Sequence, residues 1–205
     1  MRMFFLFFAV VLSFGFDVKI TKVDGRIVYY DEIIPKGISG IVICPYEKEK
    51  IICARAISYG DFAKLYAYSE LKNNAFALPL VYPKAGDKII FAKDYNRIMI
   101  IAPNQIDYLK VKAKYSKNVI ISPDVFIAFV EDDLTKDEFV NFARKMNIGR
   151  YVFVLNDGIY EVDAISFYVI RKLPYKGSSY HKALFTYANF NLEPINYKVF
   201  FRGIK

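Results

Sequence analysis

The sequence predicts an α/β (mixed) protein, with a small β-barrel-like N-terminal domain followed by a Rossmann-like three-layer α/β domain. Three observations support this prediction. Residues 98–102 are an uninterrupted apolar run, which is typical of a strand covered on both faces. A stretch with helical spacing and a second apolar run at residues 119–121 follow, as in a β-α-β unit. Before residue 95, short apolar runs alternate with turn residues, which favours a barrel or a sandwich.

Residues 1–15 are predicted to be a cleaved signal peptide. Arg2 supplies a positive charge, and the stretch from there to Phe16 is uncharged. Ser13 and Gly15 are small residues at the positions that a cleavage site requires. The uncharged stretch is shorter than the roughly 20 residues that span a bilayer. The alternatives are an uncleaved anchor and a buried first strand. Cleavage predicts an exported protein of the cell surface, the outer membrane or the periplasm.

Residues 16–95 are expected to form the small β domain. Its clearest turn is Asp24-Gly25, because these residue types suit the tight turn of a β-hairpin. The expected strands of this domain are residues 18–23, 26–30, 41–44, 51–56, 62–68 and 88–91.

Residues 96–173 are expected to form the α/β domain. Pro103 is predicted to start a helix directly after the first strand, because a proline in the first turn sacrifices no hydrogen bond. The apolar residues of this helix recur at helical spacing and are expected to face the sheet: Ile106, Leu109 and Ala113. Its basic residues are expected to lie mostly in solvent: Lys110, Lys112 and Lys114.

Two further helices and three further strands complete this domain. Ser122-Pro123-Asp124 combines an N-cap, a first-turn proline and an acid, and so predicts a helix through Val130. Thr135 and Glu138 form a capping box that predicts the next helix. The remaining strands are expected at residues 151–155, 159–162 and 166–170, with a turn at Asn156-Asp157-Gly158 between the first two. We expect three parallel strands with an antiparallel extension.

Residues 174–205 form an aromatic-rich C-terminal tail that is expected to pack on the two domains. Apolar Tyr197, Val199 and Phe201 alternate with other residues, which suggests one last strand.

Three segments carry a resemblance to a known family. They are NRIMIIAPNQIDYLKVK at residues 96–112, IISPDVFIAFV at 120–130 and YVFVLNDGIYEVD at 151–163. In these segments the chain resembles the N-terminal domain of the bacterial plasminogen-binding surface proteins. The similarity runs from about Asp17 to about Leu173. The resemblance implies that the partner is host plasminogen, whose kringle domains recognise lysine.

The composition argues against several classes of function. The formal charge is +8, but the basic residues are scattered among 21 acidic ones and form no block, which disfavours a nucleic-acid partner. The one histidine, His181, lies in the irregular tail, and no nucleophile or metal-ligand motif is present. The acidic pair Asp132-Asp133 is typical of a solvated helix end. We therefore predict no catalytic residue, no cofactor, no metal and no enzyme activity.

A crevice at the ends of the parallel strands is a possible ligand site. The residues expected there are Asn104, Gln105, Ser122, Asp124 and Asn156. No glycine lies in the first strand–helix turn, which argues against a nucleotide. The simpler interpretation is that Ser122 and Asp124 only cap a helix, and we favour it.

Cys44 and Cys53 are predicted to form a disulfide after export. With Lys48-Glu49 as a two-residue turn, the two cysteines face each other at a non-hydrogen-bonded pair. Pro45 is the weak point, because this register requires an N–H that proline lacks. A pair of buried thiols is the alternative.

We therefore expect a secreted or surface-exposed, non-enzymatic binding protein, similar to the plasminogen-binding family. The first alternative is a periplasmic structural or assembly module with cell-envelope protein partners. The second is a periplasmic small-molecule binder that uses the crevice. The family resemblance makes Lys205 the expected partner-binding residue, because a C-terminal lysine offers an ammonium and a carboxylate together. The alternative is a solvated lysine without a role.

Overall fold

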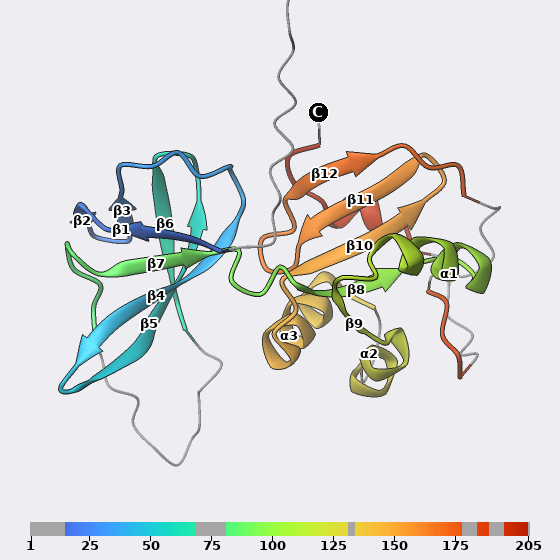
Figure 1. Cartoon of the computed structure of the whole chain (residues 1–205), viewed down its shortest axis with the longest axis horizontal. Coiled ribbons are helices and arrows are strands. Elements are labelled where there is room, and N and C mark those ends of the chain that lie inside the picture. Colours follow the sequence, from blue (N-terminus) through green and yellow to red (C-terminus); the bar gives the residue numbers. More distant parts are fainter. Residues whose placement is uncertain (1–14, 69–80, 131–133, 178–183, 189–194, 205) are drawn as a thin grey trace, which may run out of the picture.

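The structure is a computed structural model that describes residues 15–68, 81–130, 134–177, 184–188 and 195–204 (Figure 1). The predicted signal peptide lies outside these residues except for Gly15. Two β-sheets lie side by side, and the three α-helices accompany the second one (Figure 1). The predicted domain boundaries stay a prediction, although the strands of the first sheet all precede Ala92 and those of the second all follow Asn96.

The first sheet has seven antiparallel strands and curls into an open half-barrel (Figure 1). Its strands lie in the order β1-β7-β4-β5-β6-β3-β2. Their bounds are β1 Phe16–Lys19, β2 Lys22–Asp24, β3 Ile27–Tyr29, β4 Ser39–Tyr46, β5 Glu49–Ser58, β6 Phe62–Ala67 and β7 Lys88–Phe91. The concave side encloses a core that includes Val28, Val42, Ile89 and Phe91, all fully buried. The predicted Asp24-Gly25 hairpin is confirmed, with Asp24 opposite Ile27.

The second sheet has five strands in the order β12-β11-β10-β8-β9. Their bounds are β8 Arg97–Ile101, β9 Val119–Ile121, β10 Arg150–Leu155, β11 Gly158–Asp163 and β12 Val169–Leu173. Strands β9, β8 and β10 are parallel, whereas β11 and β12 extend the sheet in the antiparallel sense. The helices are α1 Gln105–Lys114, α2 Pro123–Phe129, α3 Lys136–Met146 and the 3₁₀ helix η1 Tyr197–Phe200.

Helices lie on both faces of the second sheet. Tyr108 and Val111 of α1 pack with Ile98, Ile100 and other residues of one face. On the opposite face, α2 and α3 supply a cluster of aromatic rings, in which Phe126 and Phe139 lie with their centroids 4.4 Å apart. All six residues of β10 are buried, as the apolar run predicts for a central strand.

The sequence signals at two helix starts are confirmed. Ser122 Oγ accepts the N–H of Asp124 at the start of α2, where Pro123 is the first helical residue. Thr135 Oγ1 accepts the N–H of Glu138 at the start of α3. Both signals are local, because the cap and its donor lie two or three residues apart.

The predicted fold class is wrong. The described residues hold twelve strands and only three short α-helices, so the molecule is mostly β and contains no Rossmann-like three-layer α/β domain. The turn at Asp157 and the antiparallel extension of the parallel strands are as expected. The class is wrong because the seven antiparallel strands of the first sheet, together with β11 and β12, outnumber the three parallel strands. The first sheet curls so far that β1 and β2, at the two ends of its strand order, are joined by only Ile20 and Thr21.

The predicted orientation of α1 is also wrong. The helix begins at Gln105 with Asn104 as its N-cap, so Pro103 precedes it. Its buried residues are Asp107, Tyr108 and Val111, whereas the apolar residues that were expected to face the sheet are exposed: Ile106, Leu109 and Ala113. Long-range hydrogen bonds explain the difference, since buried Asp107 accepts the hydroxyl of Tyr175 at 2.6 Å from 68 residues away. Local periodicity carries no information about that partner.

Two predicted strands near the C-terminus differ from the structure. The strand expected at residues 166–170 is β12 and begins at Val169, because Ser166 lies in the preceding turn and donates from its N–H to Asp163. The last expected strand is η1, whose N-cap is Asn196. Tyr197 of η1 is buried against Phe153, with centroids 5.0 Å apart. Its aromatic residues thus pack at helical spacing on the core of the second sheet.

Asp163, at the end of β11, joins the two sheets. Its Oδ2 accepts the N–H and the hydroxyl of Ser39 from β4 and the hydroxyl of Tyr95, each at 2.8 Å. Its Oδ1 accepts the N–H groups of Ile165 and Ser166. Asp163 is fully buried, and these five donors compensate for the loss of its hydration.

Candidate functional site

Several residues discussed in the sequence analysis lie outside the described residues. They are Asp132, Asp133, His181 and Lys205. Within the described ranges, no group of three or more histidine, cysteine, aspartate or glutamate residues is arranged to hold a metal ion. No helix in the described part of the chain is long and apolar enough to cross a membrane.

The crevice residues at the ends of the parallel strands are held by local contacts. Asn104 caps α1 by accepting the N–H of Asp107, and its amide donates to the Asp107 carboxylate at 3.0 Å. Ser122 caps α2 and donates to Asp124 at 2.9 Å. Gln105 and Asn156 are exposed. The structure thus brings the caps to one edge of the sheet, where each polar group serves its own helix.

Residues 184–188 occupy the same edge of the sheet. The N–H of Phe185 donates to Ala102 O at 2.6 Å, directly after β8. The N–H of Ala188 donates to Asp124 Oδ1 at 2.8 Å. The rings of Phe185 and Tyr187 pack on Tyr108 of α1, with centroids 5.4 and 5.9 Å away. The chain itself therefore satisfies the groups that a small ligand would use there.

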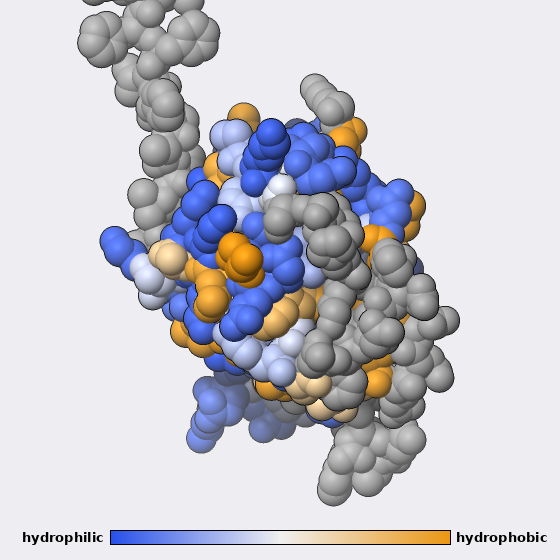
Figure 2. All heavy atoms as spheres, turned by 90° about the vertical axis from the view of Figure 1, so that its right-hand side faces the viewer, coloured by the Kyte–Doolittle hydropathy of each residue, from blue (hydrophilic) through white to orange (hydrophobic). Residues whose placement is uncertain are grey.

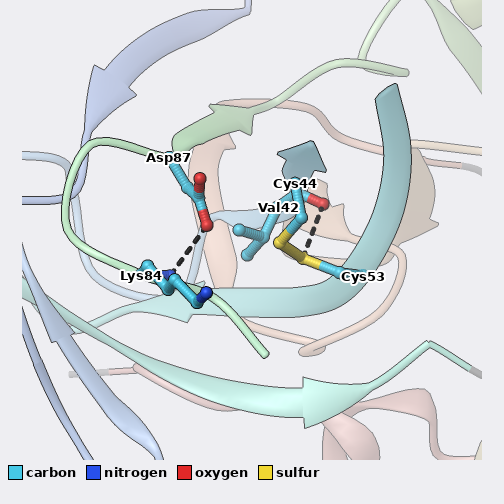
Figure 3. Close-up of a disulfide and its surroundings, with 5 residues drawn as sticks. All are labelled: Val42, Cys44, Cys53, Lys84 and Asp87. Carbon is cyan, nitrogen blue, oxygen red and sulfur yellow. Dashed lines mark hydrogen bonds between the residues drawn. A yellow bond between two sulfur atoms is a disulfide. The ribbon is translucent and has the colours of Figure 1, made fainter. Parts of the chain in front are cut away.

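Cys44 and Cys53 are joined by a disulfide between β4 and β5, with their Cα atoms 5.8 Å apart (Figure 3). Cys44 is fully buried in the core of the first sheet, and Cys53 packs against that core. Cys53 Sγ lies 3.6 Å from Val42 O. A disulfide sulfur carries no hydrogen, so the dashed line drawn there in Figure 3 marks a close contact and not a hydrogen bond. The disulfide therefore stabilises the β4–β5 hairpin.

The predicted register of this hairpin is wrong by one residue at the turn. Tyr46 pairs with Glu49 and Cys44 with Ile51, so the turn residues are Glu47 and Lys48. This register places Pro45 at a non-hydrogen-bonded pair, where its missing N–H is not required. A register shift between Val42 and Ile43 then leaves Cys53 as the extra residue of a bulge. The bulge brings Cys53 within reach of Cys44.

A buried ion-pair network stands on the α1 side of the second sheet. Glu161 is fully buried and pairs with Arg150, whose Nη1 lies 2.6 Å from Glu161 Oε2. Arg171 pairs with Glu161 Oε1, which also accepts the hydroxyl of Tyr115 at 2.7 Å. Burial and the neighbouring Glu161 carboxylate raise the pKa of Tyr115, which therefore stays protonated. Glu161 has a donor on each oxygen, so the network serves the structure of the sheet.

A different cluster lies at the surface of the opposite face, where the turn after β10 meets β12 and η1. Asp157 Oδ2 accepts three donors: the hydroxyl of Tyr160 at 2.7 Å and the ammonium groups of Lys172 and Lys198, each at 2.9 Å. Both ammonium groups also lie over the Tyr160 ring, 4.9 and 5.5 Å from its centroid. We call these four residues the Asp157 cluster.

The electrostatics of the Asp157 cluster favour its charged form. Burial alone would raise the pKa of Asp157, but the hydrogen bonds from Tyr160, Lys198 and Lys172 hold it well below the ordinary value of a carboxyl. The contacts with Tyr160 and Asp157 raise the pKa of Lys172, and the Asp157 contact raises that of Lys198. The cluster therefore carries two positive charges and one negative charge, on side chains that are 39% to 48% exposed.

From the sequence, Asp157 is expected only in a turn, and neither Lys172 nor Lys198 stands out. Part of the arrangement has a sequence signal, because Tyr160 on β11 stands opposite Lys172 on β12. A turn aspartate three residues before a strand tyrosine, with a lysine on the next strand, predicts that pair. Lys198 has no such signal, since it reaches Asp157 from 41 residues away through η1.

Comparison with known proteins gives a match over nearly the whole chain. The family model described as the N-terminal region of plasminogen-binding protein pgbA matches residues 16–201. The chain belongs to this family. The family description is that of a binding protein, and the resemblance found in the sequence is confirmed. No curated protein and no solved structure shows significant similarity to the chain.

Proposed function

We propose that the chain is an exported, non-enzymatic protein that binds host plasminogen, and that the Asp157 cluster is the group which plasminogen recognises. The family is named for plasminogen binding, and the kringle domains of plasminogen recognise lysine. The observation that carries the proposal is the sharing of one exposed carboxylate by two exposed lysines, Lys172 and Lys198. A lysine-like ligand consists of these same two charges.

The sharing allows one ammonium group to leave the cluster at low cost. If Lys172 turns outward to a partner, Lys198 and Tyr160 still neutralise and hydrogen-bond Asp157. The displaced ammonium remains within one lysine side chain of the carboxylate. Exposed ion pairs contribute only about 0–1 kcal/mol each, so a partner's buried acidic site can outcompete one.

Plasminogen binding is tested by surface plasmon resonance on the purified chain. We expect Lys172→Gln/Lys198→Gln to weaken binding about tenfold or more, since hydrogen bonds to charged groups contribute roughly 1.5–3 kcal/mol. Asp157→Asn keeps both lysines and should weaken binding while reducing competition by a lysine analogue. The matched control is Lys110→Gln/Lys117→Gln, which removes two exposed lysines from the other face. Equal affinity of the two double variants would contradict the assignment to this cluster.

The same assay distinguishes Lys205 from the Asp157 cluster as the group that plasminogen recognises. Lys205→Gln should leave affinity and competition unchanged if the Asp157 cluster is the recognised group. A loss restricted to Lys205→Gln would move the site to that residue and leave plasminogen binding itself intact. No measurable binding of the wild-type chain would reject the function.

A further inference from the structure

Helix α1 presents an apolar stripe that no described residue covers. Ile106 is 62% exposed and Leu109 is 47% exposed. Together with exposed Ala113 they lie three and four residues apart, and so form one line along the outward side of the helix. The inward side is fixed by Tyr108 and Val111, which are buried against the sheet. The stripe is therefore a stable feature of the folded surface.

The stripe is surrounded by positive charge. Four exposed lysines lie on α1 or in the turn after it: Lys110, Lys112, Lys114 and Lys117. Among the described residues, no carboxylate forms an ion pair with any of them. The one acid of the helix, Asp107, is turned inward, where it accepts Tyr175 and Asn104.

Contacts with the protein hold two of the lysines beside the stripe. Lys112 Nζ lies 5.7 Å from the centroid of the Tyr108 ring, and Lys114 Nζ lies 5.3 Å from that of Tyr175. Helical geometry places Lys110 and Lys114, one turn apart, on one side of the stripe and Lys112 on the other. Aliphatic tips are thus flanked by ammonium groups on both sides.

α1 lies at the right-hand end of the molecule in Figure 1. Figure 2 turns that end toward the viewer and shows isolated hydrophobic side chains set among hydrophilic ones.

We propose that α1 docks onto the surface of a bilayer that contains anionic phospholipid. The aliphatic tips of Ile106 and Leu109 would enter the boundary between headgroups and acyl chains. The lysines would reach the lipid phosphates, since their long stems follow the apolar surface while the ammonium groups stay in the polar layer. A convex helix edge with separated aliphatic tips suits a fluid, planar surface.

This surface is distinct from the proposed plasminogen site. α1 packs on the face of the second sheet that includes Ile98 and Val152, whereas Tyr160 of the Asp157 cluster belongs to the core on the other face. The two surfaces can therefore be occupied at the same time. A membrane-docked chain would leave the Asp157 cluster accessible to a soluble partner.

The test is co-sedimentation of the full chain with sonicated vesicles. One vesicle population is phosphatidylglycerol mixed with phosphatidylcholine, and the other is phosphatidylcholine alone. We expect binding to the anionic vesicles only, and weaker binding at high salt because screening shortens the range of the lysine charges. Lys110→Gln/Lys117→Gln should reduce the partition coefficient about 25-fold, at roughly fivefold per lysine. Ile106→Ser should reduce it about tenfold through lost apolar burial.

Matched controls lie on the first sheet. Lys48→Gln/Lys50→Gln removes two exposed lysines from the β4–β5 hairpin, and Ile33→Ser removes an aliphatic side chain that is 85% exposed. Both controls should bind vesicles like the wild type. Circular dichroism confirms that each variant is folded. Loss of binding in the controls equal to that in the α1 variants would overturn the proposal, as would equal binding to neutral vesicles.

Competition by a soluble polyanion distinguishes docking onto a membrane from binding to an acidic protein. Polyglutamate added to the anionic vesicles should compete weakly, because it offers charge without an apolar layer. If polyglutamate abolishes vesicle binding at equal charge concentration and Ile106→Ser has no effect, the proposal is overturned in favour of an acidic protein partner.

Discussion

Ser39 and Asp163 lie 124 residues apart in the sequence, yet both the N–H and the hydroxyl of Ser39 donate to Asp163 Oδ2 at 2.8 Å. Ser39 begins β4 in the first sheet, and Asp163 ends β11 in the second. Asp163 therefore hydrogen-bonds the two sheets to each other. Ser166 adds a second bond across the junction, from its hydroxyl to Gly37 O.

Replacing Asp163 should destabilise the whole described fold. Asp163→Asn puts an amide group against donors that need an acceptor, and the expected loss in the free energy of unfolding is about 2–4 kcal/mol. Urea unfolding measures it, with Asp17→Asn at an exposed position as the control. An unchanged unfolding midpoint for Asp163→Asn would show that the junction contributes little.

Gly149 is predicted to tolerate no side chain. A Cβ atom there would lie 2.3 Å from the backbone carbonyl of Asp94, at the connection between the two sheets. Backbone atoms cannot move aside cheaply, so Gly149→Ala should cost about 3 kcal/mol of unfolding free energy. Gly25→Asn is the comparison, because nothing lies within 4 Å of its Cβ and asparagine accepts the left-handed conformation. The comparison uses thermal and urea unfolding, and equal stabilities of the two variants would contradict the steric argument.

Reduction of the Cys44–Cys53 disulfide should weaken the first sheet. The bridge closes a short loop, and its removal is expected to cost about 2–3 kcal/mol. Unfolding of the oxidised chain with and without a reductant measures the effect. The Cys44→Ala/Cys53→Ala variant should match the reduced chain and be insensitive to reductant.

Alkaline pH should destabilise the protein between about pH 10 and 12. Burial raises the pKa values of Tyr30, Tyr108 and Tyr175 from 10.0 to about 12. The unfolded chain therefore loses these protons first, so their contribution to stability is complete below pH 10.0 and is lost as the pH rises through the folded-state value. Tyr108→Phe keeps the ring and removes one ionisation, so its stability should fall less over this window. Tyr66→Phe, at an exposed ring, is the control.

Features that depend on neighbouring residues could be predicted from the sequence. The caps at Ser122 and Thr135 and the hairpin at Asp24-Gly25 involve donors, acceptors or turn residues only a few positions apart. The central strand β10 was recognisable because residues 151–155 form an uninterrupted apolar run, and the structure buries all six residues of the strand. These predictions required no knowledge of distant partners.

Features set by distant partners could not be predicted in this way. The burial of Asp107, which orients α1, depends on Tyr175. The Asp157 cluster depends on η1 for its second lysine, and the alternating aromatics of η1 are as compatible with a strand as with a helix turn. The prediction of the fold class was wrong because strand pairing is also set by residues far apart in the sequence. The parallel strands and their antiparallel extension were expected, but the seven antiparallel strands of the first sheet make the molecule mostly β.

The bonds from Ser39 and Tyr95 to Asp163 also determine the order in which the protein can be completed during synthesis. The first sheet leaves the ribosome well before β11 exists. Asp163 is synthesised 124 residues after Ser39 and 68 residues after Tyr95, so both donors are made long before their acceptor. Until then both donors are hydrated, and the edge that will meet the second sheet is open. Contacts of such long sequence separation slow folding. The N-terminal half therefore reaches its final stability only when the C-terminal half has emerged.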